Sequence, residues 1–142
     1  MNAYLDSSAF LKLLLGYEGG GDDLRIEMDV VGQISTSRLT YVEALAALAA
    51  ARRSGRVGRV DYEVAVADFD RIWDSLDIVE LTTKVAIDAA TAADVYGLRA
   101  GDAIQLASAH SLDGSVITLI AWDARLRAAA SASGVTCYPT EV

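Results

Sequence analysis

Two aspartates directly follow apolar segments that read as strands. Asp6 comes after residues 3–5, and Asp123 comes after residues 116–121, the most apolar strand candidate, with only Trp122 between them. In open parallel sheets, ligands bind outside the carboxyl ends of the strands. The two carboxylates would therefore converge at one end of a sheet if the first and fourth strands are neighbours.

Two further acids open predicted helices. Glu43 is placed in the first turn of a helix that follows the strand 33–37, and Asp102 opens a helix after breaks at Gly97 and Gly101. Singly, each acid has a structural explanation, because carboxylates at a helix N-terminus cap free N–H groups and complement the helix dipole. Jointly, the four acids flank otherwise apolar sequence, which favours one shared site.

Carboxylates that converge in this way call for a cation, because they repel and raise one another's pKa without one. Cys137 is the only cysteine, and the only histidine, His110, lies eight residues beyond Asp102. Oxygen ligands alone favour Mg²⁺ or Mn²⁺. Such an ion lowers the pKa of a bound water and aims it at a phosphorus atom, so the pattern predicts hydrolysis of a phosphodiester.

The elements that must position these acids alternate along the chain. Apolar runs and turn residues predict strands at 3–5, 33–37, 78–81, 116–121 and 136–138. Spacing and capping residues predict helices from residue 9, and at 22–31, 40–53, 61–75, 85–96, 102–112 and 123–132. This alternation predicts an α/β fold, with a mainly parallel sheet covered by helices on both faces.

Length, composition and charge limit the possible classes of protein. The 142 residues, 53% of them hydrophobic, fit a single domain over residues 1–142. No apolar run reaches the roughly 18 to 20 residues that a bilayer requires, and the first residues show no secretory pattern, so we expect a cytoplasmic protein with no membrane contact. The net charge of −8 excludes a broad basic face for nucleic acid.

Four strings of sequence resemble the PIN-domain family, and particularly the VapC-type toxins of bacterial toxin–antitoxin pairs. In chain order they are YLDSSA from Tyr4, RLTYVE from Arg38, YGLRAGDA from Tyr96 with LASA behind it, and TLIAWDARL from Thr118. Each string is weak alone. The four in this order, with an acid in each, span essentially the whole chain and make the resemblance fairly specific.

The resemblance implies a three-layer α/β/α fold and an endoribonuclease that cleaves RNA with Mg²⁺ or Mn²⁺. By motif position, Asp6 and Asp102 would be the central metal ligands, and Glu43 and Asp123 would complete the acidic cluster. It also implies a cognate VapB-like antitoxin that holds the toxin inactive, and a homodimer. The RNA that is cut cannot be read from these motifs, because specificity in such a fold would lie in shape and loop contacts.

One position departs from the family pattern. The family often has Thr or Ser two positions before the last acid, where this chain has Ala121. Ser7 or Ser8 could supply the missing hydroxyl, although both are also explained as helix caps. The departure keeps open an alternative function of another class, a non-catalytic PIN-like protein-interaction module.

Basic and apolar residues near these motifs are further candidates for binding RNA or a partner protein. The densest basic run, at the tip of a predicted helical hairpin, is either a local RNA clamp or a solubilising tip: Arg52, Arg53, Arg56 and Arg59. Arg99 could reach a substrate phosphate or the acids themselves. Apolar residues of the first helical region could line a groove for a partner helix: Phe10, Leu13, Leu14 and Tyr17.

Two other phosphoryl-handling folds also place an Asp after a strand. A receiver domain needs paired acids near the first strand, an acceptor Asp in mid-chain and a late Lys, whereas the later half of this chain offers only Lys84. A haloacid-dehalogenase phosphatase needs a second Asp two residues after the first, where this chain has Ser8. Neither pattern is present.

Overall fold

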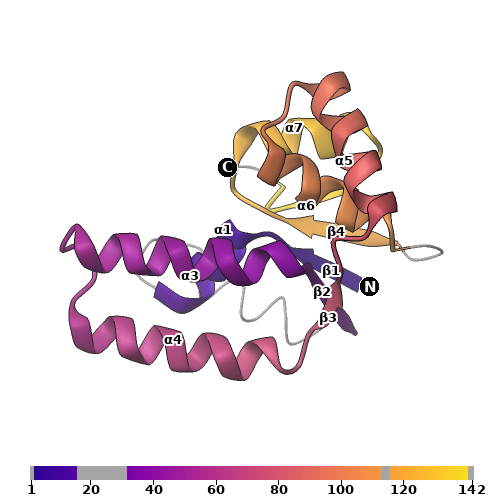
Figure 1. Ribbon diagram of the computed structural model, residues 1–142. Coiled ribbons are helices and arrows are strands. Elements are labelled where there is room, and N and C mark those ends of the chain that lie inside the picture. The colour runs from indigo at the N-terminus through magenta and orange to yellow at the C-terminus, as the bar shows by residue number, and fades with distance from the viewer. Residues whose placement is uncertain (1, 16–31, 113–115, 141–142) are drawn as a thin grey trace.

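The computed structural model describes residues 2–15, 32–112 and 116–140. In these ranges the strands are β1 (Asn2–Leu5), β2 (Gln33–Ser37), β3 (Asp77–Val79), β4 (Ile117–Ile120) and β5 (Thr136–Tyr138) (Figure 1). The helices are α1 (Ser7–Leu15), α3 (Arg38–Arg53), α4 (Arg59–Trp73), α5 (Thr83–Tyr96), α6 (Ala100–His110) and α7 (Ala124–Ala132). The helix predicted at 22–31 lies outside the described residues.

The five strands form one parallel sheet in the order β3-β2-β1-β4-β5. β1 is therefore central, with Tyr4 opposite Ser35 on β2 and Leu5 opposite Ile120 on β4. Because the strands run in the same direction, their carboxyl ends meet at one edge. The first and fourth strands are neighbours, as convergence of Asp6 and Asp123 requires.

Hydrophobic cores lie on both faces of the sheet, because successive strand residues point to opposite sides. Tyr4 and Leu119 pack in the core formed with α5, α6 and α7. Ala3, Leu5 and Ile120 pack in the core formed with α1, α3 and α4. The prediction of a three-layer α/β/α fold around a parallel sheet is confirmed.

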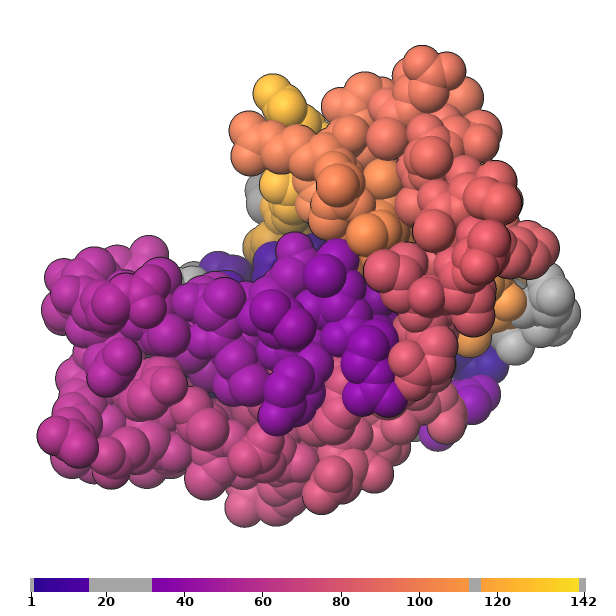
Figure 2. Space-filling view, viewed as in Figure 1, coloured from indigo at the N-terminus to yellow at the C-terminus, as the bar shows by residue number. Residues whose placement is uncertain are grey.

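Helices α3 and α4 form a long hairpin that extends beyond the sheet (Figure 1). Residues of α1, α3 and α4 and of the connecting turn form a further core inside it, including Leu15, Leu48 and Val57. Figure 2 shows the hairpin and the α5–α7 layer as two walls of an open notch, which lies on the side where the strands end. The fold thus leaves the carboxyl edge of the sheet open between the hairpin and the α5–α7 layer.

The apolar residues of α1 do not line an open groove. Phe10 is fully buried and packs edge-on against Phe69 of α4, with ring centroids 5.5 Å apart, and Leu13 is buried in the same core. Leu14 is half-buried, and Tyr17 lies outside the described residues. The predicted partner groove was therefore wrong at Phe10 and Leu13, because the α3–α4 hairpin covers them.

The helix starts differ from the predicted ones by one or two residues, and two of these differences bear on the acids. Helix α3 begins at Arg38, where the Ser37 hydroxyl caps it by accepting the N–H of Leu39, so Glu43 lies in the second turn rather than the first. Helix α6 begins at Ala100, which places Gly101 inside the helix and not in a break before it. Helix capping therefore does not explain an acid at position 43.

Over the residues the structure describes, no helix combines the length and the apolar character that crossing a membrane requires.

Candidate active site

Asp6 is the first residue after β1, and its side chain is buried, with 3% exposed. Its Oδ1 accepts the backbone N–H of Ala9 at 3.0 Å and the hydroxyl of Ser8 at 2.6 Å. Its own N–H donates to the carbonyl of Ile120 on β4. Asp6 therefore caps α1, as its position predicts, but aspartate is rarely buried to this degree unless it is paired.

The pKa of Asp6 is raised to about 6, chiefly by burial and to a smaller extent by the carboxylates of Glu43 and Asp102. The hydrogen bonds from Ser8 and Ala9 act in the opposite direction, because they stabilise the charged form. Asp6 thus lies within electrostatic reach of two of the other three predicted acids. In the absence of a cation, ionisation of this buried carboxyl group costs more free energy than ionisation of an exposed one.

Asp102 lies in the first turn of α6, and its pKa is raised by partial burial and by the carboxylate of Asp123. Asp123 is the N-cap of α7 and accepts the N–H of Leu126 at 2.9 Å. Arg99 and Arg125 lower the pKa of Asp102, so both guanidinium groups lie close to it. The four predicted acids form one linked electrostatic group, and Arg125 is a neighbour that the sequence analysis missed.

Glu43 reaches this group from α3, and both oxygens of its carboxylate are in close contact with α6. Oε1 accepts a hydrogen bond from Nε2 of Gln105 at 2.8 Å. Oε2 lies so near Gly101 that a Cβ atom there would stand 2.9 Å from it. Gly101 has no positive φ, so the backbone conformation does not require glycine here. Glycine instead leaves room for the Glu43 carboxylate, because it has no side chain.

A buried polar cluster supports Glu43 from behind. Gln105 is 2% exposed, its Oε1 accepts the hydroxyl of Tyr4 at 2.6 Å, and its Nε2 donates to the hydroxyl of Thr40 at 3.0 Å. The sequence analysis missed this cluster. One signal was available, because Gln105 is a large amide in the mostly apolar stretch 103–109, nearly all of which is buried in α6.

The hydroxyl nearest to Asp6 is that of Ser8. Ser8 Oγ donates to Asp6 and accepts the backbone N–H of Trp122 at 3.0 Å, so it ties the start of α1 to the segment after β4. Ala121, which replaces the hydroxyl residue common in the family pattern, is fully buried. Of the two serines considered as substitutes, Ser8 is the one with hydrogen bonds into the site.

The acids do not form a ready cage for a metal ion. Across the described parts of the chain, no three Asp, Glu, His or Cys side chains stand in an arrangement that could hold one ion directly. The donor chemistry nevertheless fits Mg²⁺, which usually keeps several waters and takes only one or two protein carboxylates. The buried Asp6, whose pKa is raised chiefly by burial and further by two carboxylates, is a residue whose ionised form such an ion would stabilise.

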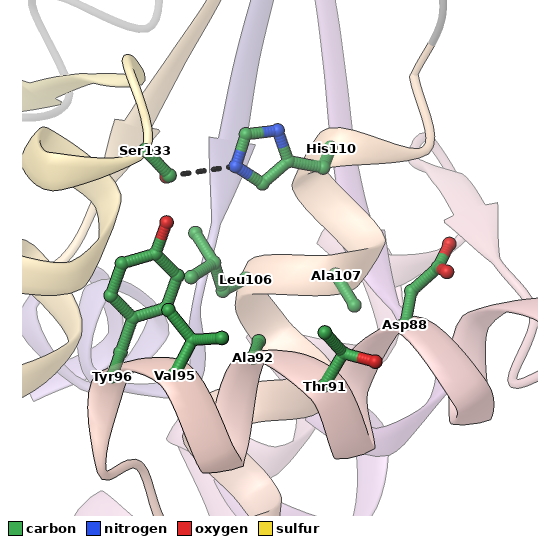
Figure 3. Close-up of a pocket in the computed structure, with 9 residues that line it drawn as sticks. All are labelled: Asp88, Thr91, Ala92, Val95, Tyr96, Leu106, Ala107, His110 and Ser133. Carbon is green, nitrogen blue, oxygen red and sulfur yellow. Dashed lines mark hydrogen bonds between the residues drawn. The ribbon is translucent and has the colours of Figure 1, made fainter.

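The single histidine lies outside the acidic group. His110 is the last residue of α6, and its Nε2 is 2.8 Å from Oγ of Ser133, in a pocket between α5, α6 and the end of α7 that none of the four acids lines (Figure 3). Asp94, considered as an additional outer acid, is exposed on α5. Both residues are placed as the sequence indicated.

The arginines of the hairpin tip are exposed, as predicted. Arg52 lies over the ring of Tyr62, with its guanidinium carbon 4.9 Å from the ring centroid, and Arg59 pairs with Glu63 one turn along α4. These contacts orient two of the arginines along the hairpin. They do not distinguish an RNA clamp from a solubilising tip.

A parallel sheet with four acids grouped at its carboxyl edge is the arrangement that the resemblance implied. The chain belongs to the PIN-domain family, whose model matches residues 3–131. It is 35% identical over 139 residues to Ribonuclease VapC45 of Mycobacterium tuberculosis, which covers 98% of this chain and 96% of that protein. This likeness places it among the VapC-type members of the family.

Two solved structures show the same fold. FitAcB from Neisseria gonorrhoeae superposes with a TM-score of 0.70 at 18% identity, over 97% of this chain and 97% of that one. A chain of a toxin–antitoxin complex from Klebsiella pneumoniae gives a TM-score of 0.65 at 18% identity, over 89% of this chain and 90% of that one.

Proposed function

We propose that this protein is a Mg²⁺- or Mn²⁺-dependent endoribonuclease that hydrolyses RNA phosphodiester bonds. The observation that carries the proposal is the burial of Asp6 at the carboxyl edge of the sheet, with a pKa raised to about 6 and with Glu43 and Asp102 acting on it. The name of the relative at 35% identity, a ribonuclease, supports the same activity.

Asp6 and Asp102 would be the central ligands of the ion, with Glu43 and Asp123 directed at its remaining coordination sphere. When bound, such an ion supplies an activated water and neutralises charge on the leaving oxygen. Asp6 is prepared for this role by Ser8 and Ala9, whose hydrogen bonds fix Oδ1. Both hydrogen bonds are accepted by Oδ1 rather than by Oδ2.

The substrate phosphate would be bound by Arg99 and Arg125. Both lie close enough to Asp102 to lower its pKa, and both are exposed at the N-terminal ends of α6 and α7. Two guanidinium groups beside the acids supply the local positive charge that a protein of net charge −8 needs in order to hold RNA. The notch between the hairpin and the α5–α7 layer leaves this edge open (Figure 2).

We also propose that the protein is the toxin of a toxin–antitoxin pair, inhibited by a cognate VapB-like antitoxin, and that it forms a homodimer. The VapC name of its relative and the toxin–antitoxin complex among similar folds support a partner of this kind. A basic antitoxin segment that reaches the acids would be electrostatically favourable. Antitoxin variants with Arg changed to Glu should then bind more weakly, and unchanged affinity would contradict this part.

The activity is tested by cleavage of a mixed RNA panel with Mg²⁺, with Mn²⁺ and with EDTA, using antitoxin-free protein. Asp6→Asn and Asp102→Asn should each lower the rate by at least about 100-fold, because each removes a charged oxygen ligand from the ion. Asp94→Asn, the matched control on the exposed face of α5, should retain full activity.

Equal cleavage by all four proteins would identify a contaminating nuclease. A wild-type protein that binds the antitoxin but cleaves no RNA under any condition would favour the alternative function, a non-catalytic PIN-like protein-interaction module. Ala121, which lacks the usual hydroxyl, is the residue that favours that alternative.

A further inference from the structure

The amide of Gln105 joins three elements of the fold at one buried point. Its Oε1 accepts the hydroxyl of Tyr4 on β1, and its Nε2 donates to Thr40 and Glu43 on α3 at 3.0 and 2.8 Å. Because the Glu43 carboxylate can only accept, a half-turn of the amide about its last bond would turn Oε1 toward it and break that hydrogen bond. The orientation of the amide is therefore fixed.

A series of hydrogen bonds runs from Gln105 through Thr40 and Thr36 to the backbone carbonyl of Leu5. This last acceptor determines which group donates in each of them. Thr36 Oγ1 lies 2.6 Å from the carbonyl oxygen of Leu5, which can only accept, so the single hydroxyl hydrogen of Thr36 is used there. The 2.8 Å contact between Thr36 and Thr40 must then be donated by Thr40, whose oxygen accepts from Gln105. The remaining N–H of Gln105 is directed at Glu43.

This arrangement holds the Glu43 carboxylate on both sides. Oε1 is held by the N–H of Gln105, and Oε2 abuts the backbone of Gly101 on the same helix. The residue that anchors the far end of the chain of hydrogen bonds, Leu5, directly precedes Asp6. The cluster thus fixes Glu43 relative to the strand that carries Asp6.

We propose that Gln105 is a positioning residue that orients the Glu43 carboxylate toward a divalent cation, with Tyr4 and Thr40 fixing the amide. The proposal rests on the proposed function, because it takes Glu43 to belong to the metal site. Substitution of a group that orients a metal ligand typically costs 10- to 100-fold in metal affinity or activity.

The test is direct titration of Mn²⁺ without RNA, in which electron paramagnetic resonance measures free Mn²⁺. Gln105→Met keeps the size of the side chain but removes both the donor and the acceptor, and should weaken Mn²⁺ binding about 10-fold or more. Tyr4→Phe removes only the hydroxyl that holds Oε1 and should give a smaller shift in the same direction.

Three further variants separate positioning from stability. Leu106→Ala destabilises the core from the neighbouring position on α6, and should leave the Mn²⁺ affinity unchanged below its unfolding temperature. The double variant that combines Glu43→Gln and Gln105→Glu retains a hydrogen bond between the two positions but moves the negative charge from α3 to α6. It should recover thermal stability relative to Gln105→Glu alone, without recovering Mn²⁺ affinity.

Wild-type affinity in Gln105→Met would overturn the positioning role and leave the proposed function standing. An equal loss in Leu106→Ala would also overturn it, because the effect would then be one of general stability. If Gln105→Met does not fold, unchanged affinity in Tyr4→Phe overturns the role. A wild-type protein that binds no Mn²⁺ would overturn both the proposed function and this inference.

Discussion

The contact between Gly101 and Glu43 leads to a prediction in which activity falls while stability stays nearly unchanged. Gly101 lies inside α6, where alanine is ordinarily the better helix former by about 0.8 to 1 kcal/mol. A Cβ at this position would stand 2.9 Å from Glu43 Oε2. In Gly101→Ala, the carboxylate must therefore move by a few tenths of an ångström.

The displaced group is the end of a flexible side chain, so the structural penalty is small. Weakening its hydrogen bond to Gln105 costs about 0.5 to 1.5 kcal/mol, which roughly offsets the gain in helix propensity. We expect the unfolding temperature of Gly101→Ala to stay within about 4 °C of the wild type. Mn²⁺ affinity and RNA cleavage should fall by about 10-fold or more, because Glu43 is misdirected.

The assay combines thermal unfolding, Mn²⁺ titration and cleavage kinetics on the same preparations. Glu43→Asp shortens the side chain and relieves the contact, so adding Gly101→Ala in that background should give the full stabilisation of about 1 kcal/mol. Wild-type cleavage and Mn²⁺ affinity in Gly101→Ala would refute the reasoning. So would a loss of stability of several kcal/mol, which would mean that Glu43 cannot yield.

Three further predictions concern charge. Because the folded pKa of Asp6, about 6, exceeds its ordinary value of 3.8, its ionisation destabilises the metal-free protein as pH rises from 4 to 7. Asp6→Asn in EDTA should therefore gain up to about 3 kcal/mol at pH 7 and little at pH 4 in urea unfolding; an equal effect at both pH values would contradict this. Mg²⁺ at about 100 times its Kd should stabilise the wild type by about 2.7 kcal/mol, but not Asp102→Asn, as thermal unfolding would show. Arg99→Gln and Arg125→Gln should raise KM for RNA and each flatten the dependence of log affinity on log salt by about 0.7, and an unchanged slope would exclude phosphate contacts.

Local sequence signals were sufficient to predict the order and approximate limits of most elements. Thr82 caps α5 by accepting the N–H of Val85, and Asp123 caps α7 by accepting that of Leu126, and both helices begin within two residues of the predicted starts. The strand at Gln33–Ser37 also has the predicted limits. These features depend on residues a few positions apart, which is why they can be read from the chain alone.

The role of Glu43 shows where local reasoning fails. The sequence placed it in the first turn of its helix, where the helix dipole would explain an acid, but the Ser37 cap starts α3 earlier and leaves Glu43 in the second turn. Gly101 was read as a break, whereas it lies within α6 and makes room for the carboxylate. The first error came from a local cap at Ser37 that the sequence analysis did not use, whereas the second concerns a contact between two separate helices.

By itself, the sequence determined the α/β class, the parallel sheet and the four acids proposed as metal ligands, because strand–helix alternation and junction residues are local properties. Only the tertiary structure decided that β1 lies beside β4, that Ser8 is the hydroxyl at Asp6, and that Gln105 holds Glu43. Those decisions depend on strand pairing and buried hydrogen bonds between distant residues. Tyr4 and Gln105, for example, are 101 positions apart, and only the packed fold brings them together.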